Sequence, residues 1–457
     1  MKYILTVLAF LSINISAQFG FNKDDESNPK ELFANGEQGV WYDPSDLSTL
    51  FIDSAGATPV TNVEQPVGLM LDKSGRGNHA KTTATTKRPY LSARYNLLTW
   101  TEDFSNAAWG SFSMLSPVAG QSDAFGTNKA YKLVPDTSNA QHRIQLIPTT
   151  IAASHTFIIY AKSAGYNYLG LRVGGDGTSV CCVNLSTQAI TQVTGVTATA
   201  ILADNNYTKI TIIVPNYISG AYLRINIMSA DMILSSSVFK ADGTSGIIIC
   251  FPDLRVSNDG VGLPAYQRVT SSTDYDVVGF PKYLKFDGID DYLVTNSINF
   301  SSTDKMSVFA GVRKLSDIGQ STVAELSSSI ASNNGAFLLS APNSAAANFN
   351  FSSKGTTQVN DSVATYTSPI TNTITGIASI SSPALNSIRI NGAQAGTSSS
   401  SQGTGNFSNN PIYIGMRAGT SAKFSGRLYQ LIIRGALSND YQIYNTEQFI
   451  NLKTNAF

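Results

Sequence analysis

The sequence is poor in charge and in histidine, and each shortage excludes a class of function. Lys and Arg total 31, as do Asp and Glu, so the formal net charge of the 457 residues is zero. Only 14% of the residues are charged, and no basic run, RNP-like motif or zinc-finger spacing occurs, so we expect no nucleic-acid partner. The three histidines, His79, His142 and His155, are scattered, and we expect them at turns or on the surface rather than as bases or metal ligands.

Cysteine is also scarce, and the spacing of the three cysteines does not fit a metal site. Cys181 and Cys182 are adjacent, so on a strand they point to opposite faces and cannot both meet Cys250. A single bridge from Cys250 to one of them is one alternative after export. Buried free thiols are the other alternative, and the one we favour.

Long apolar runs are absent except near the N-terminus. Lys2 is followed by an apolar run from Tyr3 to Ile15 and then by Ser16-Ala17-Gln18, a pattern typical of a secretory signal peptide cleaved after Ala17. A buried N-terminal strand or helix is the alternative. The run is too short for a membrane span, and no later segment is long enough. We therefore expect a leader at 1–17, a flexible lead-in at 18–31 and a secreted, extracellular protein.

What the sequence does contain is a long series of short, alternating apolar runs. Phe157, Ile159 and Ala161 share one face of such a run, and turn clusters separate the runs roughly every 8–15 residues, which predicts an all-β protein built of sandwiches. The segment Leu437–Leu452 alone predicts a helix near the end, with Ser438 as its N-cap.

One acidic turn stands out at Tyr283–Val294, YLKFDGIDDYLV. The alternating pattern of a β-strand occurs on both sides of the turn, and the Asp-Gly step between them is a strong hairpin signal. The carboxylates of Asp287, Asp290 and Asp291 have two interpretations. They shape and solvate the turn, or they supply oxygens to a structural Ca²⁺ ion, which prefers clustered carboxylate and carbonyl ligands.

Three further pieces resemble the concanavalin A-like, or laminin-G-like, jelly-roll domains. They are Trp41-Tyr42-Asp43, the segment Leu71–Ala80 and Arg88-Pro89. In that family a Phe-Asp-Gly-x-Asp-Asp-Tyr-Leu strand follows closely, whereas here Phe286–Leu293 supplies it nearly 200 residues later. Phe424–Ile433 followed by a helix resembles the family's end. The resemblance implies a discontinuous sandwich made of residues 32–92 and 276–457.

The intervening residues 96–275 resemble a carbohydrate-binding-module-type jelly roll. The resemblance rests on Asn96–Trp109, Phe157–Lys162, Gly246–Leu254 and Ala265–Thr270. The order of the segments is also similar to phage or prophage tail and virion structural proteins. This similarity implies a virion location as the alternative to secretion, although virion proteins assemble in the cytoplasm without a leader.

Catalytic motifs are missing. Concanavalin A-like folds include glycoside hydrolases, which need two carboxylates flanking the sugar bond, and the resemblance implies an E-x-D-x-x-E strand that does not occur. Glu325 stands alone, and Asp290 and Asp291 are adjacent and diverge on an extended chain. No G-x-S-x-G, H-E-x-x-H or P-loop motif is found. We expect no enzyme; a hydrolase with an unrecognised site is the weakest alternative.

The polar faces of several strands in the inserted segment are the predicted ligand site. Aromatic rings pack on sugar C–H faces, and Arg and Asn donate to hydroxyls. Ordinary solvent-facing residues with good β-propensity are the alternative interpretation. We expect non-catalytic binding of a glycan or cell-surface polysaccharide. A purely structural tail, virion or adhesin component, assembling as a homo-oligomer or particle, is the second hypothesis. The predicted ligand residues are Tyr160, Tyr168, Arg172, Tyr222, Arg224 and Asn226.

Overall fold

The computed structural model describes residues 28–457 except 151, 175–178, 231–233 and 235–236. The predicted leader and most of the lead-in lie outside these residues. The last lead-in residues begin the 3₁₀ helix η1 (Pro29–Phe33). Its Leu32 and Phe33, which follow the predicted lead-in, are buried in one cluster with Trp41.

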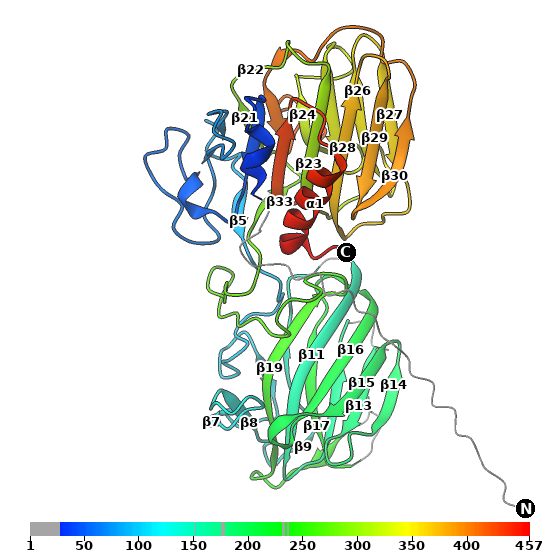
Figure 1. Ribbon diagram of the computed structural model, residues 1–457. Coiled ribbons are helices and arrows are strands. Elements are labelled where there is room, and N and C mark those ends of the chain that lie inside the picture. The colour runs from blue at the N-terminus through cyan, green and yellow to red at the C-terminus, as the bar shows by residue number, and fades with distance from the viewer. Residues whose placement is uncertain (1–27, 151, 175–178, 231–233, 235–236) are drawn as a thin grey trace, which may run out of the picture.

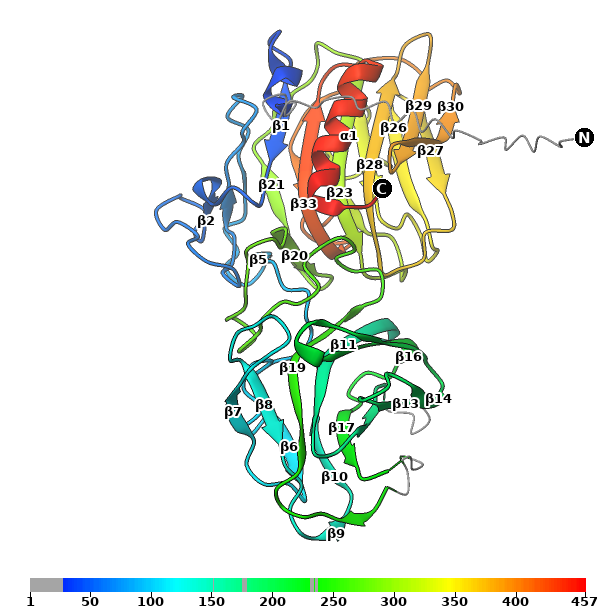
Figure 2. The same cartoon turned by 60° about the horizontal axis from the view of Figure 1, so that its bottom comes forward.

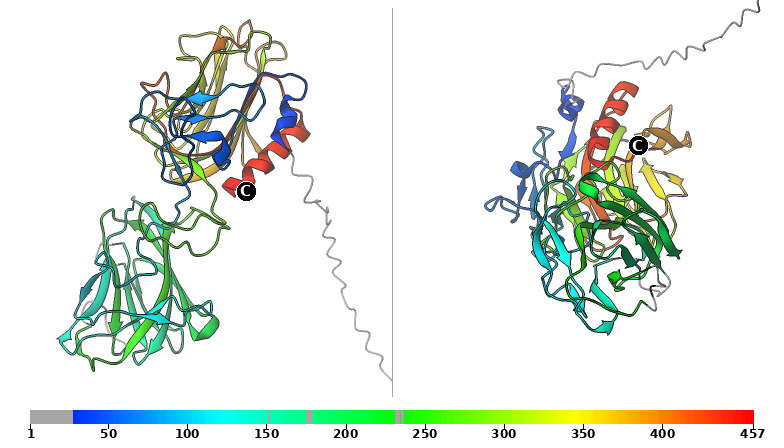
Figure 3. Two further views of the ribbon diagram at one scale, coloured as in Figure 1. Left: turned by 90° about the vertical axis from the view of Figure 1, so that its left-hand side faces the viewer. Right: turned by 90° about the horizontal axis from the view of Figure 1, so that it is seen from below.

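The chain is all-β with one short C-terminal α-helix, as predicted, and it forms two sandwiches that Figure 3 shows stacked end to end. We call them the terminal sandwich, residues 28–93 and 276–457, and the inserted sandwich, residues 94–275. All named strand pairs are antiparallel. In the described part of the chain, no helix is long and apolar enough to span a bilayer.

The terminal sandwich encloses one large apolar core between two sheets (Figures 1 and 2). The first sheet has β1 (Gly39–Tyr42) paired with β33 and otherwise runs in the order β30 (Ala393–Ser398), β29 (Leu385–Ile390), β28 (Ile370–Ser379), β23 (Lys305–Lys314), β33 (Ser425–Arg434), β20 (Tyr283–Asp287) and β5 (Tyr90–Ser92). The second runs in the order β2 (Leu50–Phe51), β3 (Leu69–Met70), β4 (Ala80–Lys81), β21 (Leu293–Thr295), β32 (Ile412–Ile414), β24 (Thr322–Leu326), β25 (Ala336–Ser340), β26 (Phe349–Lys354) and β27 (Gln358–Val363).

The helix α1 (Asp440–Thr454) lies across β33, β23 and β28, as Figure 2 shows, so these central strands are covered on both faces. Its N-cap is Asn439, one residue after the predicted Ser438, because Asn439 and Gln442 form a reciprocal capping box. Gly311 on β23 lets the helix approach: a Cβ there would lie 2.7 Å from Ile450 Cγ2.

The inserted sandwich has its own core, built from the alternating apolar residues of its two sheets. The first sheet runs in the order β14 (Ile190–Thr194), β13 (Val180–Asn184), β12 (Tyr168–Arg172), β17 (Leu223–Met228), β10 (His142–Leu146) and β6 (Gly110–Phe112). The second runs in the order β15 (Thr197–Leu202), β16 (Thr208–Tyr217), β11 (Ala153–Ala164), β19 (Gly246–Val256), β8 (Ala130–Leu133) and β7 (Val118–Gln121).

Short elements complete the described structure. Two-stranded ladders join β9 (Asn139–Ala140) to β18 (Phe239–Lys240) and β22 (Ile298–Asn299) to β31 (Asn409–Asn410). Two further 3₁₀ turns are η2 (Leu47–Thr49) and η3 (Asp204–Asn206).

The chain leaves the terminal sandwich after β5 and returns at β20, and these two strands pair directly, Leu91 opposite Leu284. Strand β20 also pairs with β33, whose far end pairs with β1. The strands that carry Trp41 and Phe286 therefore belong to one sheet.

The junction between the sandwiches is held by buried polar contacts. Asp259, after β19, forms a bidentate ion pair with Arg427 of β33 at 3.0 and 2.9 Å, and lies 3.7 Å from Arg313 of β23. The Arg427 guanidinium also stacks on Tyr283, 4.4 Å from the ring centre. Gln267 donates to the carbonyls of Ala93 and Asp276, so the start and end of the insertion are joined.

The histidines depart from the expectation of surface or turn positions. Only His79 is exposed in a turn, where its Nδ1 accepts the N–H of Asp72. His142 and His155 are buried; the ring nitrogens of His142 lie within hydrogen-bond distance of the Ser113 and Phe239 carbonyls.

All three cysteines are buried free thiols, the favoured alternative. Cys181 faces the inserted core, whereas Cys182 and Cys250 belong to two separate clusters. Burial raises the pKa of Cys181 and of Cys250 to about 12, so these two thiols are protonated at neutral pH.

Candidate functional site

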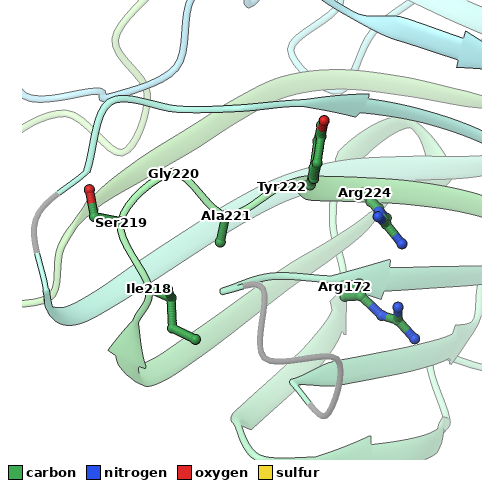
Figure 4. A pocket seen from close by; sticks show the side chains of 7 residues that line it. All are labelled: Arg172, Ile218, Ser219, Gly220, Ala221, Tyr222 and Arg224. Atoms are coloured by element: carbon green, nitrogen blue, oxygen red, sulfur yellow. The ribbon is translucent and has the colours of Figure 1, made fainter.

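The antiparallel ladder of β12 and β17 produces a polar outer face on the inserted sandwich. Register places Arg172 directly opposite Arg224, and Gly170 opposite Asn226. The intervening residues Leu169, Leu171, Leu223, Ile225 and Ile227 are buried in the core. Because successive side chains alternate between faces, the arginines point outward, and Figure 4 shows their side chains running in the same direction.

A hollow lies beside the two arginines. Its volume is about 320 Å³, and it is lined by Arg172, Tyr222, Arg224 and the turn 218–221 (Figure 4). A second hollow of about 180 Å³ shares both arginines and includes Asn226. Tyr222 is 39% exposed, and its ring centre lies 5.3 Å from the Arg224 guanidinium, so the residue offers an aromatic surface at the edge of the hollow.

Tyr168 and Asn226 share this face but are engaged in packing. Tyr168 packs against Met228, Cys182 and Leu234, and Asn226 is 4% exposed and donates to the Gly170 carbonyl at 3.2 Å. They support the face, while Arg172, Tyr222 and Arg224 present free groups on it.

Tyr160 does not join the other predicted residues. It lies on β11 in the opposite sheet, where it is 5% exposed and packs with Phe251 and Tyr207. Alternation predicted correctly that Tyr160 points away from the core. It does not tell which of two sheets a strand joins, and the outer faces of the two sheets point in opposite directions.

Two residues of the same face were missed by the sequence reasoning. Arg143 and Gln145 on β10 lie opposite Asn226 and Arg224, respectively. The Arg143 guanidinium stacks on Phe112 at 4.4 Å. The signal was present, since His142–Leu146 alternates. The buried residues His142, Ile144 and Leu146 point inward, so Arg143 and Gln145, which lie between them, point outward.

The predicted acidic turn brings Asp287, Asp290 and Asp291 together, with one carboxylate oxygen from each lying within 4.8 Å of the others. Two of the three carboxylates already accept hydrogen bonds from the backbone of the turn. Asp287 accepts the N–H groups of Ile289 and Asp290, and Asp291 accepts the N–H of Asp287. Burial, with the neighbouring charges of Asp287 and Asp290, raises the pKa of Asp291 to about 7. Three carboxylate oxygens placed this closely could hold a hard cation such as Ca²⁺.

Residues 287–440 match the family model of the Concanavalin A-like lectin/glucanases superfamily. The match begins at the acidic turn and ends at the start of α1. No curated protein sequence matches the chain.

Solved structures align with parts of the chain. The heptameric SAP-like pentraxin of Limulus polyphemus aligns at a TM-score of 0.29 and 12% identity, over 35% of this chain and 78% of that one. The CBM40 of the Ruminococcus gnavus IT-sialidase, solved with α2,3-sialyllactose, aligns at 0.27 and 14%, over 32% and 83%. The binding domain of botulinum neurotoxin DC, in complex with SialylT, aligns at 0.29 and 13%, over 37% and 43%. The chain therefore spans less than half of the toxin domain.

The Concanavalin A-like superfamily covers both lectins and glucanases, which differ in whether a pair of free carboxylates faces the sugar. Glu325 on β24 is fully buried; one oxygen pairs with Arg417 at 2.8 Å and the other accepts the N–H of Ile330. A carboxylate held in this way is not free to face a sugar. Neither of the two hollows beside Arg172 and Arg224 is lined by a described Asp or Glu.

Proposed function

We propose that the protein binds a glycan, or a glycan-bearing cell surface, through the outer face of its inserted sandwich and without catalysis. The observation that carries the proposal is the hollow of about 320 Å³ beside the exposed Tyr222 ring, lined by Arg172 and Arg224. An aromatic ring packs on the C–H face of a sugar, and guanidinium groups donate several hydrogen bonds in a fixed geometry.

The match of residues 287–440 to a lectin and glucanase superfamily is compatible with this assignment. Fold alone does not decide function, so the absence of catalysis rests on the buried, paired state of Glu325. We propose an extracellular setting from the N-terminal sequence. Display on a virion is the alternative setting and rests on the order of the sequence segments.

We further propose a structural Ca²⁺ ion held by Asp287, Asp290 and Asp291. A cation that binds only the folded state raises stability by mass action. Added Ca²⁺ should therefore raise the midpoint of thermal unfolding, and Asp290→Asn should abolish the rise. Equal midpoints with Ca²⁺ and with a chelator would show that the carboxylates serve the turn alone.

A glycan array with the purified full chain tests the main proposal. We expect Tyr222→Ala to remove binding, because it takes away the aromatic surface while leaving the β12–β17 core intact. Tyr444→Ala is the matched control, since Tyr444 is 50% exposed on α1 in the other sandwich. Failure to bind any glycan, together with assembly into oligomers or particles, would favour the purely structural role.

A further inference from the structure

The outer face of the inserted sandwich carries three arginines rather than two. Arg172 on β12 lies opposite Arg224 on β17, and Arg143 on β10 lies opposite Asn226, two residues along β17 from Arg224. We call Arg143, Arg172 and Arg224 the arginine cluster. Directly opposed residues on antiparallel strands have Cβ atoms about 5 Å apart, and diagonal neighbours about 7–8 Å, so the three side chains share one small area.

The cluster has no counter-charge among the described residues. Two other arginines of the inserted sandwich are paired: Arg255 with Asp253 at 2.7 Å, and Arg268 with Asp274 and Asp276 at 3.1 and 3.0 Å. Arg94 instead donates to the backbone carbonyls of Asn96, Leu97 and Leu98. In the part of the chain that the structure describes, no ion pair involves Arg143, Arg172 or Arg224. Among the described residues, the carboxylates of Asp253, Asp274 and Asp276 therefore pair with Arg255 and Arg268 and not with the cluster.

This arrangement is unfavourable in the protein alone. Like charges directly opposite one another destabilise a sheet. Burial and the charges of Arg224 and Arg172 lower the pKa of Arg143, and burial followed by the charge of Arg172 lowers the pKa of Arg224. The Nε atoms of all three are buried without a hydrogen-bond partner, as is Oε1 of Gln145, which is 8% exposed.

We propose that the arginine cluster binds the anionic substituent, a carboxylate or a sulfate, of an acidic glycan. The inference rests on the proposed glycan-binding function and specifies its ligand class. An anion would accept hydrogen bonds from several guanidinium groups at once and neutralise their repulsion. The sugar ring that carries the anion would lie in the adjoining hollow against Tyr222. A nucleic acid fits less well, because the net charge of the chain is zero and the cluster is confined to one sheet face.

Titration calorimetry with three oligosaccharides of one backbone and length tests this inference: a neutral form, a uronic-acid form and a sulfated form. We expect one acidic form to bind about ten-fold or more tightly than the neutral form, because hydrogen bonds to charged groups are stronger than those between neutral groups. The tighter of the two acidic forms identifies the substituent. The preference should weaken as salt rises.

Arg172→Gln and Arg143→Gln should each weaken binding of the acidic form about ten-fold or more while leaving the neutral form nearly unchanged. Lys209→Gln is the matched control, because it removes one positive charge from β16 on the opposite sheet. The thermal midpoint of the arginine variants should stay equal or rise, since a repulsive charge is removed, so lost binding is not lost folding.

Four outcomes would overturn the inference. Equal affinity for neutral and acidic forms, lost in Tyr222→Ala, would leave the proposed function standing without its anionic ligand. An equal loss in Lys209→Gln and Arg172→Gln would show unspecific attraction. A DNA duplex binding as tightly as the acidic glycan would show the same. Binding of none of the three oligosaccharides would remove both this inference and the proposed function.

Discussion

The ion pair between Asp259 and Arg427 should govern how the two sandwiches unfold. Asp259 is 6% exposed and faces two arginines, of which Arg313 is fully buried and Arg427 is 9% exposed. Asp259→Ala would leave both guanidinium groups without their carboxylate. Burial already lowers the pKa of Arg313, although Asp259 opposes this effect, so the loss of the carboxylate makes the buried charge more costly still.

The expected magnitude follows from the contacts. Removing one partner of a buried ion pair destabilises a protein by about 3–5 kcal/mol, because the other charge is left uncompensated. A cavity of about 300 Å³ adjoins Asp259, Arg313 and Arg427, and water entering it would solvate the exposed arginines in part. We therefore expect a loss near the lower end, about 3 kcal/mol.

Urea unfolding followed by tryptophan fluorescence measures this effect. Trp41 reports on the terminal sandwich, and Trp100 and Trp109 report on the inserted one. We expect Asp259→Ala to lower the midpoint and to separate the two reporters into distinct transitions, because the variant loosens the junction rather than either core. Two-state analysis then no longer applies to the whole chain, and each transition is fitted by itself.

Asp274→Ala is the matched control, since Asp274 pairs with Arg268 on the surface with its side chain 58% exposed. Exposed pairs contribute little, so we expect no measurable change in the control. An Asp259→Ala midpoint equal to that of the control would refute the view that this pair holds the junction.

Three further predictions concern the turn, the helix contact and the thiols. In the folded state the pKa of Asp291 is raised to about 7 from the ordinary value of 3.8, so the free energy of unfolding should fall as the pH rises between these two values. Urea titrations of Asp291→Asn in the presence of a chelator should show a smaller dependence of this free energy on pH. An unchanged dependence would contradict the prediction. Gly311→Ala should lower the unfolding free energy by about 1–3 kcal/mol, because the new Cβ would collide with α1. Gly110→Ala is the control and should not lower it, because the nearest atom to its new Cβ would be 3.5 Å away. Equal midpoints of the two variants in calorimetry would argue against the close contact between Gly311 and α1. Cys181 and Cys250 should resist a thiol reagent until the protein is unfolded, and rapid labelling at neutral pH would disprove their burial.

Local alternation predicted much of the fold and of the candidate face from the sequence. The outward direction of Arg172 and Arg224 follows from the apolar residues between them, and the same rule applied to β10 would have added Arg143. The rule fails where the question is which strands meet. Tyr160 was grouped with residues of the opposite sheet, because alternation fixes a face of one strand and says nothing about its neighbours.

Long-range polar pairing was beyond the reach of the sequence. Asp259 and Arg427 are 168 residues apart, and each resembles an ordinary charged residue in its own segment. His142 was expected at a turn or on the surface, but it is buried, and the carbonyls of Ser113 and Phe239 lie within hydrogen-bond distance of its ring. Burial of such groups depends on partners brought together by the tertiary fold.

The direct pairing of β5 with β20 makes the inserted sandwich an exchangeable cassette. Its two ends emerge side by side from adjacent strands, so a short hairpin loop joining Ser92 to Tyr283 would close the terminal sandwich without moving any of its other strands. A different binding module with closely spaced termini would fit the same position. Both the hairpin loop and a replacement module would remove Asp259, which faces Arg313 and Arg427. Either design would therefore have to replace these two arginines or supply a new carboxylate for them.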